Sequence, residues 1–368
     1  MNIKQGIKII VFMLIVGVIA YFLCDIFEQK NNYMAKGYAS YKNCQEGTVD
    51  AVFIGTSGVN RSWIGIKAFD MYGLTVMPLS IDALPCWITL DMIKEAYRFQ
   101  NPKLVILDMR MFTKYDPSEY PKLSTTRSRR AIDTLDFFSP NRLDAINRTL
   151  SVVSQFDDEI SRFDPSLFFS FIAYHNMWSD DDFDPFEQIG STPAKYMGYY
   201  VNGKNCIKKS KQPESKWSKK TLALTDIAAE CLDEIIEYCD KKGIELLFVD
   251  TPHTLSKEES QRINEMKRIL DEKKINYMVY SDKKWYLKDE DKNDPDLVRK
   301  RFDRNKHFYD RSHVNFDGAV IFTRLFAKYL NDNYDFTDHR EDPRCPEWVG
   351  KYEKLKKKID SFKKNKNA

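Results

Sequence analysis

Two short motifs near opposite ends of the chain contain the residue types that carry out acyl transfer. Gly55-Thr56-Ser57 lies early in the sequence, and Asp310-Arg311-Ser312-His313 lies late. A serine hydroxyl becomes a nucleophile when a histidine within hydrogen-bond reach takes its proton, and that histidine needs a third group to fix its tautomer and stabilise the imidazolium. We therefore expect Ser57 to be a nucleophile, His313 its base, and Asp310 the group that orients the base.

The residues around Ser57 predict where the serine would stand. Val49 to Ile54 is an apolar run with the length and β-branched content of a buried strand, and a glycine follows it. Asn60 to Ser62 then predicts a polar helix start. A serine at the carboxyl end of a first parallel strand lies where α/β sheets place reactive groups. The start of the helix could also offer backbone N–H groups to an anion.

The residues after His313 predict the last helix of the domain. Apolar positions from Val314 to Phe326 recur at helical spacing. Asp310 stands three residues before His313, at a separation that lets its carboxylate reach the imidazole. The late motif is therefore expected in the loop that leads into this helix.

This arrangement resembles the SGNH, or GDSL-like, hydrolase superfamily, in which the serine follows the first strand and an Asp-x-x-His motif precedes the last helix. The resemblance covers residues 48–110 and 221–332. With the apolar segment near the start, the chain resembles in particular the membrane-tethered members of extracellular acyl-transfer systems, such as D-alanyl-lipoteichoic acid transfer and alginate O-acetylation proteins. The resemblance implies a membrane-bound O-acyltransferase partner and an extracellular glycan or teichoic acid acceptor.

The oxyanion site and the base each leave an open point. The family's oxyanion glycine and its Gly-x-Asn-Asp block are not plainly present, so we expect the backbone N–H groups of Ser57 and Ser80, with Arg110, to hold the oxyanion. Asp250-Thr251-Pro252-His253 offers a competing base after another predicted strand. We favour His313 because its place before the final helix matches the superfamily, and expect His253 and Arg61 at the substrate site.

The first residues predict a membrane anchor. Ile9 to Leu23 is uninterrupted and apolar, and Ile7 to Phe27 is long enough to span a bilayer. A cleaved signal peptide is the alternative, although no small-x-small cleavage site follows. The short amino-terminal tail favours a single pass with the bulk of the chain outside the cell.

Composition narrows the classes of partner. The formal net charge of +3 argues against a dedicated nucleic-acid binder. No Gly-rich phosphate loop, dinucleotide fingerprint or zinc-ligand spacing is present, so we expect no cofactor and no metal. Lysines concentrate between 351 and 366, where they either contact anionic lipid or wall polymer or belong to a solvated tail.

The segments between the motifs predict the organisation of the chain. Residues 1–27 form the anchor, 28–47 a stalk, 48–110 and 221–332 the α/β domain, 111–220 an insertion or cap, and 333–368 a basic tail. The fold class is α/β, with a three-layer parallel sheet of about five strands. Tyr196, Tyr199 and Tyr200 either offer flat surfaces for sugars or form the core of the insertion.

Three functions remain open from the sequence. The favoured one is a membrane-anchored serine acyltransferase that works through an acyl-enzyme on an extracellular polymer. The second is a carbohydrate esterase of the same fold, with water in place of the acceptor. The third is a non-catalytic glycan-binding or scaffold protein.

Overall fold

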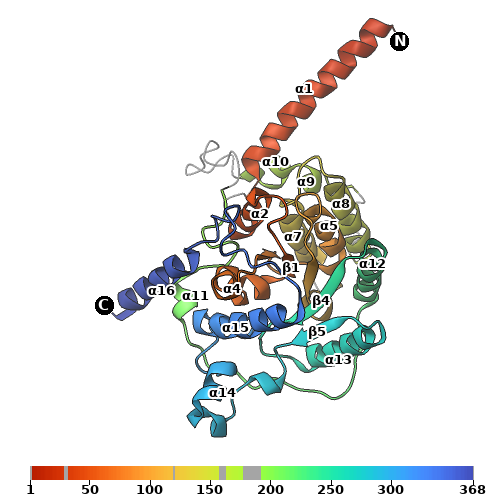
Figure 1. Cartoon of the computed structure of the whole chain (residues 1–368). Coiled ribbons are helices and arrows are strands. Elements are labelled where there is room, and N and C mark those ends of the chain that lie inside the picture. Colours follow the sequence, from red (N-terminus) through yellow and green to blue (C-terminus); the bar gives the residue numbers. More distant parts are fainter. Residues whose placement is uncertain (1, 29–31, 119–120, 157–162, 177–191, 368) are drawn as a thin grey trace.

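The computed structural model describes residues 2–28, 32–118, 121–156, 163–176 and 192–367 (Figure 1). Its centre is a sheet of five strands, all parallel, in the order β2-β1-β3-β4-β5. The strands are β1 (Ala51–Gly55), β2 (Val76–Ser80), β3 (Leu104–Asp108), β4 (Glu245–Asp250) and β5 (Asn276–Val279). The expected α/β class with five parallel strands is confirmed.

Helices cover both faces of the sheet. On one side α15 (Phe316–Asn333) packs with α3 (Ser57–Ser62) and α4 (Gly65–Tyr72), and on the other α5 (Cys86–Ala96) packs with α8 (Pro140–Val153) and α12 (Asp226–Lys242) (Figure 1). β1, β2 and β3 are buried along their whole length, which explains why they lack the alternation of half-exposed strands. α13 (Lys257–Glu272) lies between β4 and β5 in the chain, and α14 (Pro295–Lys300) lies between β5 and α15.

Aromatic side chains join α15 to the sheet. The ring of Phe326 contacts Phe53 of β1 at 5.7 Å, Trp63 at 5.4 Å and Tyr280, just after β5, at 6.0 Å. Each such ring contributes about 1.5–3 kcal/mol through burial, which fixes the helix that follows His313 against the strand that precedes Ser57. This packing brings the two ends of the sequence to one site.

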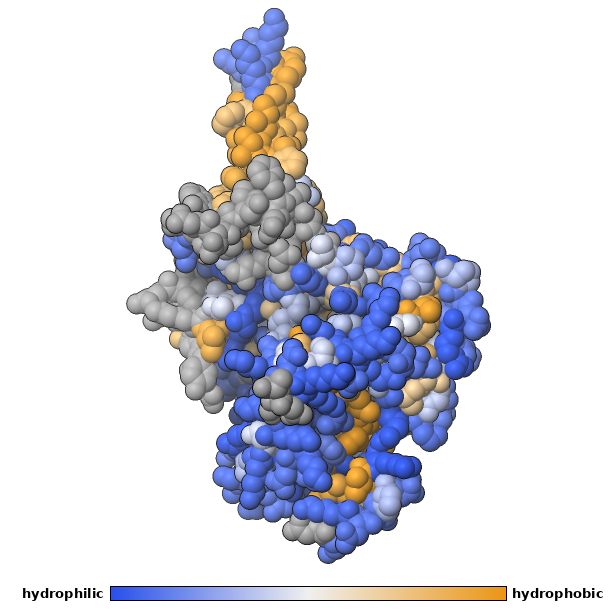
Figure 2. Space-filling model, turned by 90° about the vertical axis from the view of Figure 1, so that its left-hand side faces the viewer, coloured by the Kyte–Doolittle hydropathy of each residue, from blue (hydrophilic) through white to orange (hydrophobic). Residues whose placement is uncertain are grey.

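The amino-terminal helix projects away from the rest of the molecule. α1 (Ile3–Phe27) is, among the described residues, the one helix long and apolar enough to cross a membrane. Figure 2 shows it as an apolar column above a body whose visible surface is largely hydrophilic. Only its last turns contact the body, where Cys24 is buried.

The segment expected to be a stalk is instead part of the folded domain. α2 (Tyr33–Asn43) packs against β2 and buries Met34, Tyr38 and Tyr41. The side chain of Asn32 accepts hydrogen bonds from the N–H groups of Met34 and Ala35, which fixes the start of the helix. The rings of the tyrosines that made the segment look polar are buried, so the folded domain begins much closer to α1 than expected.

The segment expected to be a cap is distributed over several parts of the domain. α6 (Arg110–Thr113) directly follows β3, α7 (Pro121–Ile132) packs beside α8, and α9 (Pro165–Phe168) and α10 (Ser170–Ala173) lie at the base of α1 (Figure 1). Residues 194–201 return toward β2 and α3, and α11 (Gly203–Ile207) packs against α15 and α16. Tyr196 and Tyr199 are buried, so they belong to the core of this segment and do not offer a sugar platform.

The carboxyl-terminal residues are also folded against the domain. α16 (Lys351–Asn367) packs on α4 and α11, with Tyr352, Leu355 and Ile359 buried on one face. Trp348 stacks on Phe69 of α4, with ring centroids 5.7 Å apart. A solvated tail was expected from the lysines, but an apolar residue at every third or fourth position gives this helix a buried side.

Candidate active site

The structure brings Ser57, His313 and Asp310 together, although 256 residues separate the first two in sequence. Ser57 Oγ lies 2.7 Å from His313 Nε2. His313 Nδ1 lies 3.0 Å from each carboxylate oxygen of Asp310. With Nδ1–H donating to the carboxylate, Nε2 is free to accept the serine proton. The geometry is that of a nucleophile, its base and the group that orients the base.

The turn that presents Ser57 is fixed by Asp108 at the end of β3. Its carboxylate accepts hydrogen bonds from Thr56 N (3.1 Å) and Thr56 Oγ1 (2.5 Å). A Cβ at Gly55 would stand 2.3 Å from the Cβ of Asp108, so only glycine allows this approach. Thr56 caps α3, and Ser57 is the first residue of that helix.

The loop that presents His313 is fixed at both sides. Asp310 also accepts a hydrogen bond from Ser312 N (2.7 Å), and Asn315 caps α15 by accepting from Gly318 N (3.1 Å). The ring of Tyr309 stacks on the imidazole, with centroids 5.4 Å apart and planes 12° from parallel. The imidazole is therefore held by a carboxylate at one edge and an aromatic ring on one face.

The electrostatics favour a neutral base. Burial lowers the pKa of His313 from 6.5 to about 4; the hydrogen bond to Asp310 opposes this shift, while the positive charges of Arg110 and Arg61 add to it. Burial alone would raise the pKa of Asp310, but its hydrogen bond with His313 outweighs burial and lowers it. At neutral pH the pair is thus an uncharged imidazole and an ionised carboxylate, as a base waiting for a proton must be.

Arg110, expected at the oxyanion site, is buried beside the nucleophile with 1 % exposure. Its Nη1 donates to the carbonyl of Ser312 (3.1 Å), one residue before the base. A Cβ at Gly58 would stand 2.4 Å from this Nη1 and 2.4 Å from Thr251 Oγ1. The absence of a side chain at Gly58 therefore lets a guanidinium approach the helix that begins with Ser57.

The backbone donors expected for an oxyanion lie at the same sheet edge. Ser80, the last residue of β2, is the register partner of Gly55. The N–H of Ser57 belongs to the first turn of α3, where helix geometry leaves N–H groups without an intrahelical acceptor. Lys114 adds a further positive charge, with its Nζ 3.2 Å from Ser312 Oγ. Burial, followed by the charge of Arg110, lowers the pKa of this lysine to about 8.

Arg61, expected to bind substrate, is already paired. Its Nη1 lies 2.9 Å from Asp82 Oδ1, and its guanidinium lies over the ring of Tyr200 at 4.5 Å and near that of Tyr33 at 5.6 Å. Tyr33 also donates a hydrogen bond to Asp82. With 11 % of its side chain exposed, Arg61 joins α2, α3 and the loop after β2 rather than offering an open cation.

His253, expected to line the acceptor site or to serve as the competing base, is in the interior. It is 1 % exposed, and its Nδ1 lies 2.8 Å from the carbonyl oxygen of Thr251. Its Nε2 faces Glu259 Oε1 at 3.6 Å, while Ser57 is bonded to His313. The Asp-x-x-His after β4 therefore stabilises a buried turn and does not line an open groove.

Several residues of the site were missed from the sequence. Asp108 ends β3, Thr251 follows β4, and Asp82 lies two residues after β2, so a place at the carboxyl end of a strand was the available signal. Tyr33 and Tyr309 gave no signal, because nothing local shows that the helix after α1 reaches the site or that a tyrosine stacks on His313.

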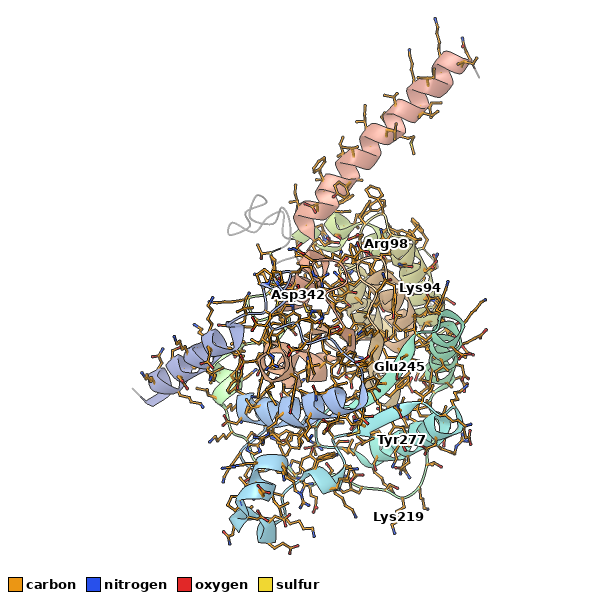
Figure 3. The ribbon with its side chains drawn as sticks, viewed as in Figure 1. Lys94, Arg98, Lys219, Glu245, Tyr277 and Asp342 are labelled. Atoms are coloured by element: carbon orange, nitrogen blue, oxygen red, sulfur yellow. The ribbon has the colours of Figure 1, made fainter. Side chains whose placement is uncertain are left out.

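A group with metal-ligand chemistry lies away from the triad. One atom each of His339, Asp342 and Cys345 lies within 4.8 Å of the others, on the segment between α15 and α16 where Figure 3 labels Asp342. His339 is already flanked by Asp50 (3.3 Å) and Asp342 (3.1 Å), and Asp342 also pairs with Arg344 (2.7 Å). Ion pairs within the protein therefore occupy His339 and Asp342, and they join the carboxyl-terminal segment to Asp50, the residue before β1.

No family model matches the chain, and no curated protein matches it. The features of this chain that indicate its chemistry are therefore the hydrogen-bonded Ser57, His313 and Asp310 and the charges around them.

Proposed function

We propose that the protein is a membrane-anchored serine O-acyltransferase of the SGNH type, which modifies an extracellular polysaccharide or teichoic-acid-like polymer through an acyl-enzyme. The observation that carries the proposal is the hydrogen-bonded array of Ser57 Oγ, His313 Nε2 and Asp310, with separations of 2.7 and 3.0 Å. Such an array is the requirement for an activated serine, whatever the acyl donor.

The first half-reaction would form the acyl-enzyme. Ser57 Oγ attacks the carbonyl carbon of an acyl donor while His313 Nε2 takes the hydroxyl proton, and Asp310 stabilises the imidazolium that results. The oxyanion would be held by the N–H of Ser57 and by backbone donors near Ser80, with the guanidinium of Arg110 behind them. The imidazolium then gives its proton to the leaving group as the tetrahedral intermediate collapses.

The second half-reaction would transfer the acyl group. A sugar or polyol hydroxyl of the acceptor gives its proton to His313 and attacks the acyl carbon, and Ser57 leaves with that proton restored. A membrane-bound O-acyltransferase that carries the acyl group across the bilayer would supply the donor, with the catalytic domain on the outer side. The apolar helix α1 and the hydrogen bond of Tyr33 in α2 with Arg61 beside the site are consistent with this arrangement.

A carbohydrate esterase is the second candidate, favoured by one specific observation. The side chain of Asp310 is 44 % exposed, so the edge of the triad is open to solvent. A transferase must keep water from the acyl-enzyme, whereas an esterase uses it. The two activities share the first half-reaction and differ only in the nucleophile of the second.

The test separates these functions in one reaction series. The full chain in detergent or nanodiscs is mixed with p-nitrophenyl acetate, and the acetylated residue is identified by peptide mass spectrometry. The proposal predicts acetyl on Ser57, and faster p-nitrophenol release together with acylated glycan when a polysaccharide or teichoic acid is added. Release that no acceptor accelerates would indicate the esterase. No acetyl on Ser57, together with p-nitrophenol release no faster than that of Ser57→Ala, would indicate the non-catalytic scaffold and overturn both enzymatic functions.

A further inference from the structure

Aromatic side chains from two parts of the chain surround the end of the membrane helix. Tyr21 of α1 stacks on Phe138, with ring centroids 5.4 Å apart and planes 18° from parallel, and meets Phe137 edge-on at 5.7 Å. Despite these contacts Phe138 is 78 % exposed. It stands on the turn just before α8, next to Phe137, which is partly buried.

The helices α9 and α10 extend this apolar surface. α10 packs along the last turns of α1, and Figure 1 shows both short helices at its base. Ile172 of α10 is 36 % exposed, and Phe163 before α9 is 60 % exposed while it stacks on Phe168 at 5.3 Å. We call Tyr21, Phe137, Phe138, Phe163 and Ile172 the aromatic collar.

The length of α1 sets the depth of the collar. No charged residue interrupts the helix between Lys8 and Asp25, a rise of about 26 Å at 1.5 Å per residue, and Lys4 to Asp25 spans about 32 Å. A hydrocarbon core of about 30 Å therefore ends close to Asp25, with Tyr21 one turn inside it. Phe138 touches Tyr21, so it must lie at nearly the same depth.

The collar cannot move independently of the helix, because a buried ion cluster joins them. Arg142 of α8 is 2 % exposed, and its Nη1 lies 3.0 Å from Glu28, the residue after α1. The same guanidinium lies 3.4 Å from Asp133 and donates to the carbonyls of Ile132 and Leu135. A buried pair of this kind is costly to break, so the domain and α1 should keep one orientation.

We infer that the aromatic collar is a lipid-docking surface, which seats the domain in the interfacial region of the bilayer beside α1. Aromatic rings favour that region because their apolar faces contact acyl chains while the surroundings remain polar. The lipid bilayer is the occupant, since the helix that the collar contacts must itself enter the bilayer. This inference does not depend on the chemistry of Ser57.

The seating has a consequence for the candidate site. Tyr33 lies six residues after Phe27 along the chain, a reach of at most about 22 Å. Its hydroxyl bonds to Asp82, which pairs with Arg61, and Arg61 Nη1 lies 3.5 Å from the carbonyl of Ser57. A docked collar would hold the site close to the membrane surface, where a lipid-linked or membrane-delivered acyl donor would be met.

Quenching by brominated lipid tests the inference on the full chain. Two variants each add one tryptophan: Phe138→Trp in the collar, and Val298→Trp on α14, which is 37 % exposed and lies at the end of the molecule opposite α1 in Figure 1. Both positions are exposed, so both should accept the larger ring, and an unchanged Tm would verify this. Each is placed in nanodiscs with or without lipid brominated near the headgroup end of the acyl chains.

The inference predicts that the added emission of Phe138→Trp falls about twofold or more in brominated lipid, whereas that of Val298→Trp is unchanged, because contact quenching requires the ring to reach the lipid. Equal behaviour of the two variants would overturn it. Unquenched emission from Phe138→Trp, with a particle mass that shows two chains in one nanodisc, would also overturn it and would assign the collar to a second copy.

Discussion

The lowered pKa of His313 leads to a quantitative prediction about the reactivity of Ser57. The serine is activated only while His313 is neutral, so the rate should follow the neutral fraction of the imidazole. Burial lowers the pKa of this histidine from 6.5 to about 4. Asp310 stays ionised above this range, because its pKa is held below the usual value.

The expected size of the effect follows from these values. An imidazole with an ordinary pKa of about 6.5 is about 97 % neutral at pH 8 and about 3 % neutral at pH 5, a roughly thirtyfold loss of reactive enzyme. With a pKa of about 4, the neutral fraction at pH 5 is still about 90 %. The labelling rate should therefore fall by only about a tenth between pH 8 and pH 5, and reach half its maximum near pH 4.

The assay is the second-order rate of labelling by an uncharged fluorophosphonate, followed by intact mass between pH 4 and pH 8. Arg110→Gln is the informative variant, because loss of a positive charge should raise the pKa of His313 and move the midpoint to higher pH. A thirtyfold drop by pH 5 in the wild type, or a midpoint near 6.5, would refute the claim that burial and the nearby arginines keep this base neutral.

Three further variants test the supports of the site. Gly55→Ala should lower the free energy of unfolding by about 1–3 kcal/mol, because the new Cβ meets Asp108 at 2.3 Å, and Tm should fall. Gly37→Ala in α2, whose Cβ would have its nearest neighbour at 3.6 Å, is the matched control and should not lower Tm. Asp310→Asn should reduce the labelling rate by about 10⁴-fold with Tm nearly unchanged, since an amide holds the wrong imidazole tautomer; a loss below tenfold would contradict its assigned role. Arg142→Leu should cost about 3–5 kcal/mol, because it removes the buried cation that pairs with the partly buried carboxylates of Glu28 and Asp133, and an unchanged denaturation midpoint would show that the ion cluster does not join α1 to the domain.

The sheet could be predicted from sequence because its signals are local. β1 and β3 are short, continuous apolar runs, each followed by a residue type suited to a turn or a helix start, and they alternate with helical spacing. The same rule indicated the position of Ser57, since parallel strands gather their carboxyl ends at one edge. His313 was predicted instead from its place before the last helix, which the family resemblance singled out. The existence of these strands, and the place of a reactive residue at the end of one of them, therefore follow from patterns within about ten residues.

What the sequence did not reveal depends on contacts between distant segments. Nothing near Tyr38 or Tyr41 shows that their rings are buried against β2, and so α2 was mistaken for a stalk. Likewise, the lysines of α16 dominated its composition, while the burial of Leu355 depends on the α4 surface it meets. Arg61 could not be distinguished from a free cation, because its partner Asp82 lies 21 residues away along the chain.

The most direct test of the account is the identity of the residue that a fluorophosphonate labels at pH 8, and its dependence on the two candidate histidines. The full chain is treated with the probe, and the site is found by peptide mass spectrometry for the wild type, Ser57→Ala, His313→Ala and His253→Gln. The account predicts one label on Ser57, lost in Ser57→Ala and His313→Ala and kept in His253→Gln. An unlabelled wild type, or labelling of Ser57 that survives loss of His313, would contradict it.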